Sequence, residues 1–351
     1  MKKEISHSFA YYLPQYHAIP ENNQWWGEGF TEWTKLNSAK AYAPQQTILT
    51  PGVLGYYSLE DANVIDNQYK LAVEHGIDTF SFWHYWFDDN DQLLEKPAEL
   101  LLQSDTQAEF CFAWANHSWW NKSENKLLKE QKYDFSLDVH FNYLVRFFKD
   151  KRYRKINNKP VLFIFDPRNC KNLKTLICQY NAKAKDEGFD GIYFIFENTN
   201  VHDELVSLCD NFLNSAQYLK KRTLIRKVYD KYFYKYISKF LHKPRFYSYR
   251  ACVKGLNDHI TESSKEIPFI FPGWDSTIRH GKNGVCLLDS NPDNFKDHLN
   301  EVAKKVYKNK DIVVVKSWNE WAEGNTMEPT AQYGKKYLEA FGEVFELKKG
   351  S

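Results

Sequence analysis

Residues 291–320, which read NPDNFKDHLNEVAKKVYKNKDIVVVKSWNE, contain one complete unit of helix and strand. Asn291, Pro292 and Asp293 form a suitable cap and first turn for a helix. The run DIVVVKSW that follows, residues 311–318, is apolar at most successive positions rather than at alternate ones. A strand of this composition is typical of a parallel sheet that is buried on both faces. The unit therefore predicts a helix packed against a parallel sheet.

The same alternation of helix and strand recurs through the chain. Helical patterns precede four of the strands, at residues 59–76, 137–150, 173–188 and 291–309. Short apolar runs predict eight strands, at residues 8–13, 78–86, 109–116, 160–166, 191–198, 210–216, 267–275 and 311–318. Gly76 and Gly188 end two of the helices where the chain must turn into a strand. Eight such units predict an α/β fold, specifically a (β/α)8 TIM barrel formed as a single domain by residues 1–351.

A doubly wound open sheet is the alternative architecture. Sheets of that kind hold nucleotide phosphates in glycine-rich loops with the patterns GxGxxG or GxxxxGK[ST]. No GxGxxG follows the first predicted strand, and GxxxxGK[ST] does not occur in the sequence. The absence of these glycine-rich patterns favours the barrel over the open sheet.

Composition limits the classes of partner. The chain has 47 Lys and Arg against 45 Asp and Glu, and its net charge of +2 predicts no general attraction to nucleic acid. Aromatic residues make up 17% of the chain, with 11 Trp and 23 Tyr. Trp and Tyr rings stack on the apolar faces of sugars while their N–H and O–H groups form hydrogen bonds. Core packing is the better explanation of any single ring, but the clustering of these rings favours a carbohydrate ligand.

The sequence shows no targeting or metal-binding pattern. The first residues, MKKEISHSFAYYLPQ, include no apolar stretch of signal-peptide length, and no window reaches the roughly 18 apolar residues of a membrane span. The six cysteines have neither CxxC nor zinc-site spacing. We expect a cytoplasmic protein with reduced, structural cysteines, no cofactor and no bound metal.

The carboxyl ends of the predicted strands carry polar and aromatic side chains. In a barrel these ends meet on one rim, which is where catalytic groups lie. The rim would bring together His84, Tyr85, Trp86, Trp114, Asn116, Asp166, Glu197, Trp274, Asp275, Trp318, Asn319, Glu320, Trp321 and Glu323. The amino-terminal ends of the strands have few such clusters, so we place the candidate active site on the carboxyl rim.

Glu320 and Glu323 are the candidate catalytic pair. Breaking or forming a glycosidic bond needs one protonated carboxyl at the bridging oxygen and a second group at the anomeric centre or its neighbour. Trp318 and Trp321 flank the two acids, and desolvation by such rings raises a carboxyl pKa and so separates the two tasks. The alternative for a strand-end acid is a solvated carboxylate or a turn cap, which suits Asp166 in particular.

Six stretches of the sequence resemble the WbsX-type family. They are YYLPQYHAIPENNQWWGEGFTEW (11–33), GIDTFSFWHYWF (76–87), LLEKP (93–97), FAWAN (112–116), PGWDSTIR (272–279) and NEWAEGNTMEP (319–329). Members of this family are similar to glycoside hydrolase family 99, are often described as glycosyltransferases, and occur in bacterial polysaccharide biosynthesis. The resemblance runs nearly from end to end and implies a (β/α)8 barrel with its active site at the carboxyl rim.

The resemblance also implies roles for individual residues. Family 99 enzymes are retaining endo-mannosidases in which the first Glu of the NEWxEG string removes the proton of the sugar 2-OH. A 1,2-anhydro sugar forms, and the second Glu acts first as general acid and then as base. Carried over, Glu320 takes the first role and Glu323 the second. We expect the glycan to contact Tyr12, Trp26, His84, Tyr85, Trp86, Trp114, Asn116, His117, Glu197, Trp274, Asp275, Trp318, Asn319 and Trp321.

Two departures from the family pattern concern the sugar contacts. The usual WANENW segment reads WANHSWW at residues 114–120, so His117 stands where an acidic residue is expected. The first loop ends in YAPQQ at residues 42–46, where relatives carry a longer Gly-His segment. The substrate of the relatives therefore does not transfer directly to this chain.

A basic, aromatic insertion is expected between the sixth and seventh strands, at about residues 219–264. Within residues 219–250 there are eleven Lys or Arg and one Asp, and apolar pairs recur every four positions. This pattern predicts an amphipathic helix. Such a helix can lie on an anionic membrane surface, where it would bring the enzyme to a lipid-linked oligosaccharide on the inner face. The alternative is an outer helix of the barrel with its basic side in water.

Three classes of function follow. The first is a carbohydrate-active enzyme that acts on α-linked, mannoside-like glycans by a retaining two-Glu mechanism, in capsule, O-antigen or exopolysaccharide production. The second is a glycosyltransferase that uses a nucleotide sugar, in which the DxD-like string Asp89-Asn90-Asp91 would hold a divalent metal. The third is a glycan-binding module without catalysis, which the departure at His117 would permit.

Overall fold

A computed structural model describes residues 2–121, 124–214, 236, 240, 243–307 and 310–348 of the chain. Its central feature is a parallel sheet of eight strands, and each strand overlaps one of the eight predicted runs. The strands are β2 (His7–Tyr12), β3 (Thr79–Asp88), β5 (Phe110–Trp114), β9 (Lys159–Ile164), β10 (Tyr193–Phe196), β11 (Asn211–Phe212), β13 (Phe269–Ile270) and β15 (Ile312–Val315). The α/β fold and its parallel sheet are therefore confirmed.

The order of the strands curls the sheet. Neighbouring strands follow the order β11, β10, β9, β5, β3, β2, β15 and β13, so the first strand, β2, pairs with both the second, β3, and the last, β15. The edge strands of the sheet are β11 and β13. Phe212 of β11 forms a single parallel bridge with Glu266, which precedes β13. Its N–H donates to the Lys265 carbonyl at 2.9 Å, and its carbonyl accepts from the Ile267 N–H at 2.9 Å. Closure into a complete (β/α)8 barrel, and a single domain over the whole chain, stay predictions.

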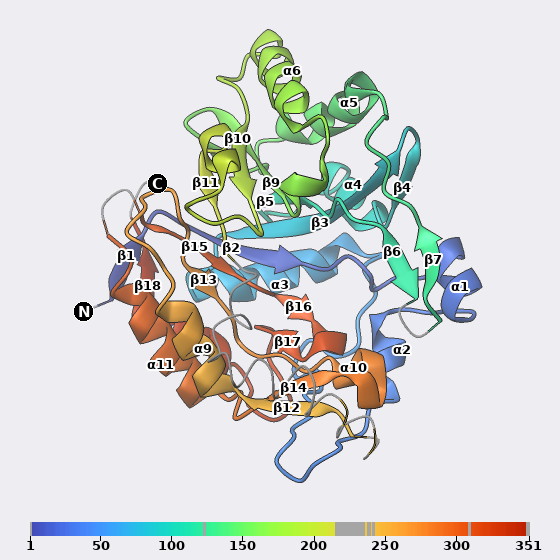
Figure 1. The fold of residues 1–351 in the computed structure, drawn as a ribbon, viewed down its shortest axis with the longest axis vertical. Coiled ribbons are helices and arrows are strands. Elements are labelled where there is room, and N and C mark those ends of the chain that lie inside the picture. The colour runs from blue at the N-terminus through green and yellow to red at the C-terminus, as the bar shows by residue number, and fades with distance from the viewer. Residues whose placement is uncertain are drawn as a thin grey trace.

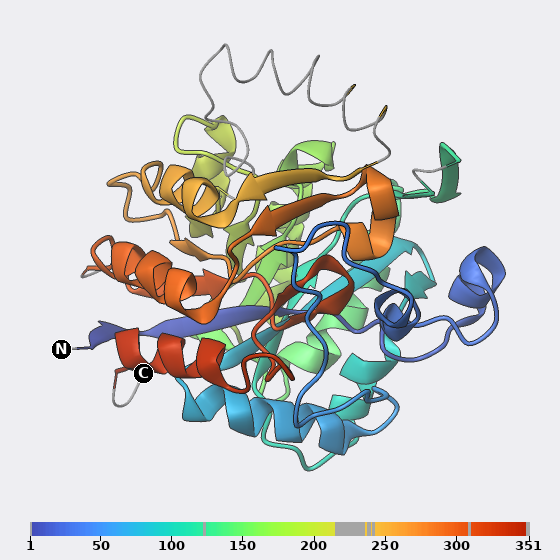
Figure 2. The ribbon, with the colours of Figure 1, turned by 90° about the horizontal axis from the view of Figure 1, so that it is seen from below.

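Helices cover the outside of the sheet. The four predicted helices are confirmed as α3 (Ala62–Glu74), α5 (Leu137–Phe148), α6 (Leu173–Asp186) and α11 (Pro292–Ala303), and α4 (Lys96–Leu102) and α12 (Lys336–Val344) join them. In Figure 1, α5 and α6 lie on one side of the sheet and α11 lies on the other. Figure 2 shows α11 beside α12, with α3 running along the strand β2.

Local sequence explains where these helices begin and end. Asn291 caps α11, because its side chain accepts a hydrogen bond from the Asn294 N–H at 3.0 Å, and Pro292 follows at the first helical position. Gly76 and Gly188 have φ values of +89° and +87°. A residue with a side chain rarely adopts this conformation, so glycine allows the chain to leave α3 and α6 and enter the next strand.

Short elements complete the fold and shape the loops. Five further helical turns are α1 (Pro20–Trp26), α2 (Glu32–Asn37), α10 (Thr277–His280), η5 (Gly281–Asn283) and η6 (Trp321–Glu323), with η1 (Pro167–Asn169) and η2 (Glu204–Leu208) between strands. The additional strand pairs are β1 (Lys3–Ile5) with β18 (Phe345–Leu347), β6 (Trp119–Asn121) with β7 (Lys126–Lys129), and β16 (Asn319–Glu320) with β17 (Asn325–Thr326). Strands β4 (Asp91–Leu93) and β8 (Lys155–Ile156) extend β3 and β9. Because β1 pairs with β18, the first and last strands lie side by side (Figure 1).

Residues 219–235, 237–239 and 241–242 of the predicted insertion lie outside the described residues, and one described part of it is corrected. Arg245–Ser248 forms strand β12, which pairs in parallel with β14 (Val285–Leu288), where a helix was expected through residue 250. Pro244 explains the change, because proline disfavours a helical conformation in the residue before it. Helix α9 (Tyr249–Asn257) follows β12, and its apolar side chains pack against Phe269 and Phe271 in a second, smaller core.

The cap of α11 gives a test of this account. Replacing Asn291 by Ala leaves the Asn294 N–H without its side-chain acceptor, so the free energy of unfolding should fall by about 1 kcal/mol. The matched control is Asp297→Ala at an exposed position inside the same helix, which should change stability by less than about 0.5 kcal/mol. Urea unfolding followed by circular dichroism measures both. Equal effects of the two substitutions would contradict the capping role.

Candidate active site

A tight hairpin at the carboxyl end of β15 carries the two candidate acids. Strand β16 pairs antiparallel with β17, and η6 forms the turn between them. Gly324 sits in this turn with φ of +56°, and a Cβ atom there would lie 2.8 Å from the Cβ of Asp275. Glycine is therefore required both for the conformation and for the close approach. Figure 1 shows the hairpin at the same end of the molecule as α2 and α10, which pack against η6.

Glu328 holds this hairpin in place. Its Oε1 accepts from Trp318 Nε1 at 3.0 Å and from Gln68 Nε2 at 2.8 Å. Its Oε2 accepts from the Tyr57 hydroxyl at 3.1 Å and from Trp321 Nε1. The side chain is buried, and burial raises the pKa of Glu328 to about 8, although all four donors favour the carboxylate. The indoles on either side of Glu320 are thus fixed by one carboxyl group.

Asn319 fixes the hairpin to the end of β2. Its side-chain oxygen accepts from the Leu13 N–H at 2.7 Å, and its amide nitrogen donates to the Leu13 carbonyl at 3.0 Å. The side chain therefore pairs with the Leu13 backbone as a neighbouring strand would. The Tyr16 hydroxyl also donates to the Asn319 carbonyl. These contacts set the position of Glu320, the next residue.

Glu320 is a buried carboxyl in an aromatic setting. Its Oε1 accepts a hydrogen bond from Trp83 Nε1 at 3.0 Å, and 6% of the residue is exposed. Burial, and after it the charge of Glu323, raise the pKa of Glu320 to about 8, while Lys316, Trp83 and Arg279 act in the opposite direction. Burial therefore favours the protonated form of Glu320 in the free protein.

Glu323 has a different partner. Its Oε1 lies 3.0 Å from Nη1 of Arg279, whose Nη2 lies 2.5 Å from Oε1 of Glu32. The same Glu32 oxygen accepts from the Ala322 N–H at 3.2 Å, next to Glu323 in the chain. Burial raises the pKa of Glu32, and the neighbouring Arg279 opposes that effect. The two carboxyls thus have different surroundings, because Glu320 accepts from an indole N–H in a buried setting and Glu323 is ion-paired with Arg279.

Comparison with known proteins places the chain in a family. The model of the family described as "Glycosyltransferase WbsX" matches residues 8–341. The chain belongs to the WbsX glycosyltransferase family. Two curated relatives are the "Uncharacterized protein WxcX" of Xanthomonas campestris pv. campestris strains B100 and ATCC 33913, each 26% identical over 349 residues. The match covers 94% of this chain, but the chain spans only 48% of the length of those relatives.

Solved structures agree on the fold. A "Glycoside hydrolase-like protein" superposes with a TM-score of 0.62 at 15% identity, over 99% of this chain and 96% of that one. The GH99 endo-alpha-mannosidase of Bacteroides thetaiotaomicron in complex with bis-tris-propane gives a TM-score of 0.56 at 16% identity, over 96% and 95% of the two chains. Family membership and shared fold together support an enzyme that acts on glycans.

Five of the predicted site residues of this WbsX-family chain lie on the interior side of the sheet or in its rim loops. Tyr85 is buried, and its pKa is raised by burial and then by the charge of Glu320. Glu197 accepts from the Tyr11 hydroxyl at 2.6 Å. Asp275 accepts from Gln46 Nε2 at 2.6 Å. The ring of His117 lies 5.2 Å from that of Phe165 at the end of β9, and Trp274 packs on Phe271.

Other predicted site residues face the helices instead. The His84 ring stacks on that of His140 of α5, and burial lowers the pKa of His84 to about 3. Trp86 also stacks on His140, and Trp114 donates to the Trp86 carbonyl at 3.1 Å. The Tyr12 hydroxyl donates to Gln68 at 2.5 Å. Because side chains alternate along a strand, these residues point away from the interior that their neighbours fill.

The remaining predicted contacts have structural partners or lie at the edge. Trp318 and Trp321 are 0% and 1% exposed, so no ring face is open to a sugar. Asn116 pairs with the backbone of Asp166 through 2.7 Å hydrogen bonds in both directions, and Asp166 itself accepts from Asn169, as a turn cap does. Trp26 is 36% exposed on α1 with Lys35 over its ring. For these residues the sequence predicted the position at the end of a strand better than the direction of the side chain.

Five residues of the site were not predicted from the sequence. They are Tyr11, Glu32, Trp83, Arg279 and Lys316. Tyr11 and Trp83 are neighbours of predicted residues and lie on the opposite strand face, so a consistent two-residue alternation would have found them. Glu32 and Arg279 stand inside the quoted motifs GFTEW and PGWDSTIR, but their meeting across 247 positions leaves no local signal.

The DxD-like string has other partners. Both carboxylate oxygens of Asp89 accept from the Ser136 N–H, at 3.0 and 3.1 Å, just before α5. Asp91 forms an ion pair with Lys129 at 2.5 Å. Within the described residues, no group of three or more His, Cys, Asp or Glu side chains is arranged to hold a metal ion. In the same part of the chain, no helix is long and apolar enough to cross a membrane.

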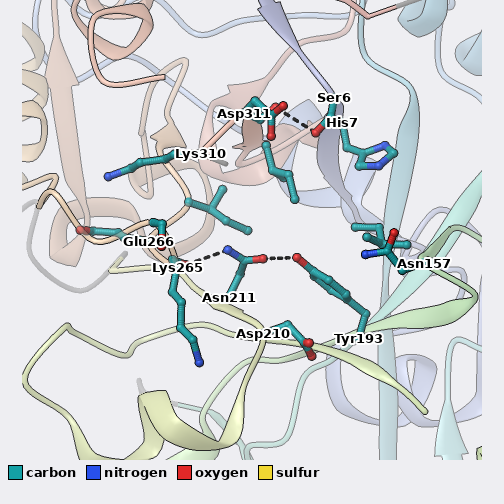
Figure 3. Close-up of a pocket in the computed structure, with 14 residues that line it drawn as sticks. Ser6, His7, Asn157, Tyr193, Asp210, Asn211, Lys265, Glu266, Lys310 and Asp311 are labelled. Atoms are coloured by element: carbon teal, nitrogen blue, oxygen red, sulfur yellow. Dashed lines mark hydrogen bonds between the residues drawn. The ribbon is translucent and has the colours of Figure 1, made fainter. Parts of the chain in front are cut away.

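A cavity of about 470 Å³ opens at the opposite, amino-terminal end of the strands (Figure 3). His7, Tyr193 and Asn211 line it, together with Lys265. The Tyr193 hydroxyl donates to Asn211, and Lys265 Nζ donates to the Val206 and Cys209 carbonyls at 3.0 and 2.8 Å. The polar groups of Tyr193, Asn211 and Lys265 thus have partners within the protein, as is typical of the end of such a sheet that supports stability.

Glu328 gives a second test. A Glu328→Gln substitution presents an amide N–H2 to two of the four donors, so hydrogen bonds are lost in a buried site. The free energy of unfolding should fall by about 2 to 4 kcal/mol. Glu346→Gln at an exposed position is the matched control and should stay within about 0.5 kcal/mol of the parent protein. Chemical denaturation measures both, and a neutral Glu328→Gln would show that Glu328 does not hold the hairpin.

Proposed function

We propose that this chain breaks or remakes glycosidic bonds in α-linked, mannoside-like glycans by a retaining mechanism that uses Glu320 and Glu323. One observation carries the proposal. At the strand end, the buried Glu320 accepts from an indole N–H, Glu323 contacts the Arg279 guanidinium, and the charge of Glu323 adds to burial in raising the pKa of Glu320. A buried pair that holds one proton between its members can supply an acid and a base in the same step.

The proposed reaction has two steps. In the first, a carboxylate takes the proton of the sugar 2-OH, O2 attacks C1, and the bond from C1 to the leaving oxygen breaks as the other carboxyl protonates that oxygen. In the second, the deprotonated acid takes a proton from water or an acceptor hydroxyl, whose oxygen attacks C1. The bond from C1 to O2 then breaks, and O2 takes back its proton from the first carboxyl. Water as the acceptor gives hydrolysis, and a sugar hydroxyl gives transglycosylation.

The family resemblance makes Glu320 the base and Glu323 the acid. Burial favours the proton on Glu320 in the free protein, so this assignment requires that the proton pass to Glu323 when the substrate binds. The pair holds one proton whether that proton sits on Glu320 or on Glu323. A pH profile of activity reports the titration of the pair as a whole and does not assign the proton to either residue. We propose the family assignment, and activated leaving groups distinguish it from the reverse.

The biological setting is also part of the proposal. We place the enzyme in the assembly or processing of a bacterial surface polysaccharide, such as a capsule, O-antigen or exopolysaccharide, in agreement with the family resemblance. A lipid-linked oligosaccharide at the cytoplasmic face of the inner membrane is the proposed substrate. No nucleic acid and no cofactor takes part.

A glycosyltransferase that uses a nucleotide sugar is the second candidate, and the description of the family favours it. Asp89 and Asp91 do not favour it, because a backbone N–H and Lys129 engage them. A transferase should be stabilised against heat by a nucleotide sugar with Mn²⁺, whereas a hydrolase should not. A glycan-binding module without catalysis, the third candidate, would bind the glycan with no turnover.

The two acids provide the direct test. Incubation with the polysaccharide repeat unit of the producing cell, followed by mass spectrometry, should show products with the parent protein. Either Glu320→Gln or Glu323→Gln should lower turnover by about 10²- to 10⁴-fold, while Glu346→Gln should not. Because the singly protonated pair is the active form, kcat/KM should fall as pH rises through about 8, where Glu320 loses its proton.

Glycosyl fluorides then separate the two roles. Fluoride leaves without protonation, so α-mannobiosyl fluoride should restore the first step in the variant that lacks the acid but not in the variant that lacks the base. Recovery in Glu323→Gln alone supports the family assignment, and recovery in Glu320→Gln alone reverses it. Unchanged turnover of the natural glycan in both variants would overturn the catalytic pair.

Membrane contact through residues 219–250 is a separate proposal, supported by the charge bias of that segment. The full-length protein should pellet with vesicles that contain anionic phospholipid and not with neutral vesicles, and added salt should release it. A triple variant that changes Lys231, Lys235 and Lys239 to Glu should pellet less. Equal pelleting with both kinds of vesicle, or none with either, would contradict the proposal.

A further inference from the structure

Lys316 lies at the junction between β15 and the hairpin that carries the two acids. Its Nζ forms an ion pair with Oε1 of Glu197 at 3.0 Å. The Glu197 side chain is 1% exposed, and its Oε2 accepts from the Tyr11 hydroxyl at 2.6 Å. The ammonium group is therefore held from the strands β2 and β10, at the ends nearest the active site.

Three aromatic rings surround the same ammonium group. Nζ lies 5.4 Å from the ring centres of Tyr11 and Trp83 and 5.1 Å from that of Phe165. Tyr11 and Trp83 are stacked, with their centres 4.4 Å apart and their planes within 13°, and Phe165 meets Trp83 edge-on at 5.5 Å. Cations are attracted to the faces of such rings. The rings thus give Lys316 a fixed place without neutralising its charge.

The Trp83 indole connects Lys316 with Glu320. One part of that indole contacts the ammonium group, and its N–H donates to the Glu320 carboxyl. A positive charge close to a buried carboxyl favours its ionised form. The charged and titratable groups that act on or near Glu320 from the surrounding elements are Tyr11 from β2, Tyr16, Glu32 from α2, Tyr85 from β3, Arg279 from α10, Lys316 and Glu323.

Stability alone does not explain a lysine and a glutamate in this position. Taking both charges out of water costs free energy that their attraction only partly offsets, and apolar residues of similar volume often serve as well or better. The surrounding wall is already aromatic, so an apolar side chain would suit the packing. The charge of Lys316 is the property that an apolar residue would lack.

We propose that Lys316 is a positioning residue of the catalytic pair, whose ammonium group, held by Glu197 and the three rings, sets how readily Glu320 gives up its proton. The inference rests on the proposed function for its catalytic meaning. Lys316 reaches the pair through Trp83 and through its charge. Glu197 moderates that charge, because it neutralises part of it.

The two members of the ion pair should have opposite effects. Lys316→Gln removes the positive charge, so the pKa of Glu320 should rise by about one pH unit. Glu197→Gln leaves the ammonium group without its carboxylate partner, so the pKa of Glu320 should fall. Lys316→Arg keeps the charge and should shift the pKa less than Lys316→Gln does. A purely structural ion pair would not give shifts of opposite sign.

Carboxyl ¹³C NMR on the full chain, labelled at the side-chain carboxyl of Glu, measures the titration directly. The Glu320 signal is assigned by its loss in Glu320→Gln, and circular dichroism checks that each variant is folded. Shifts of opposite sign in Lys316→Gln and Glu197→Gln support the proposal. Shifts of the same sign, or none in Lys316→Gln, overturn it. If Glu197→Gln does not fold, a rise in the Glu320 pKa in Lys316→Gln that exceeds the shift in Lys316→Arg supports the proposal, and no rise overturns it. If Lys316→Gln does not fold, a fall in Glu197→Gln supports the proposal, and a rise or no shift overturns it.

Enzyme assays separate this inference from the proposed function. If the protein turns over its glycan, the falling limb of kcat/KM against pH should move up in Lys316→Gln and down in Glu197→Gln. A folded protein that turns over no glycan would overturn the proposed function, while the NMR titration still decides whether Lys316 controls the proton on Glu320.

Discussion

Glu328 accepts hydrogen bonds from four side chains, and the position of both candidate acids depends on it. A buried carboxyl is costly unless its oxygens are bonded, and here each oxygen has two donors. Two of those donors are the indoles on either side of Glu320, and the other two come from Gln68 and Tyr57, far away in the chain. The same interaction that satisfies Glu328 therefore fixes the hairpin against α3 and the first long loop. The tryptophans beside the acids serve as supports of the site rather than as platforms for sugar rings.

Around this support, each acid has its own electrostatic setting. Glu323 contacts Arg279, which Glu32 holds from α2. Glu320 accepts from the neutral indole of Trp83, and the Lys316 charge acts through the rings behind it. Two carboxyls three positions apart thus differ in what they touch, because the turn η6 directs them to different elements. This difference is what lets a pair of identical side chains divide the tasks of acid and base.

The sequence predicted the strands well, because continuous apolar runs are local features, and the two candidate acids follow the last of these runs in the structure. It predicted the faces of the strands poorly. Tyr12, His84 and Trp86 point to the helices, while Tyr11 and Trp83 point to the site. A strand buried on both faces has no polar alternation, so the pattern that would set the direction of each side chain is missing. Contacts such as that of Gln68 with Glu328, 260 positions apart, arise only when the sheet has formed.

The charges of the site bear on the kind of substrate. Arg279 is engaged by Glu32 and Glu323, and Lys316 by Glu197. A diphosphate bound at this rim would have to compete with buried or half-buried carboxylates for these cations, and the same carboxylates would repel it. Sugar hydroxyls meet no such obstacle, because carboxylates and indole N–H groups are their ordinary hydrogen-bond partners. The electrostatics of the rim therefore agree with the proposed action of Glu320 and Glu323 on an uncharged glycan rather than on a nucleotide sugar.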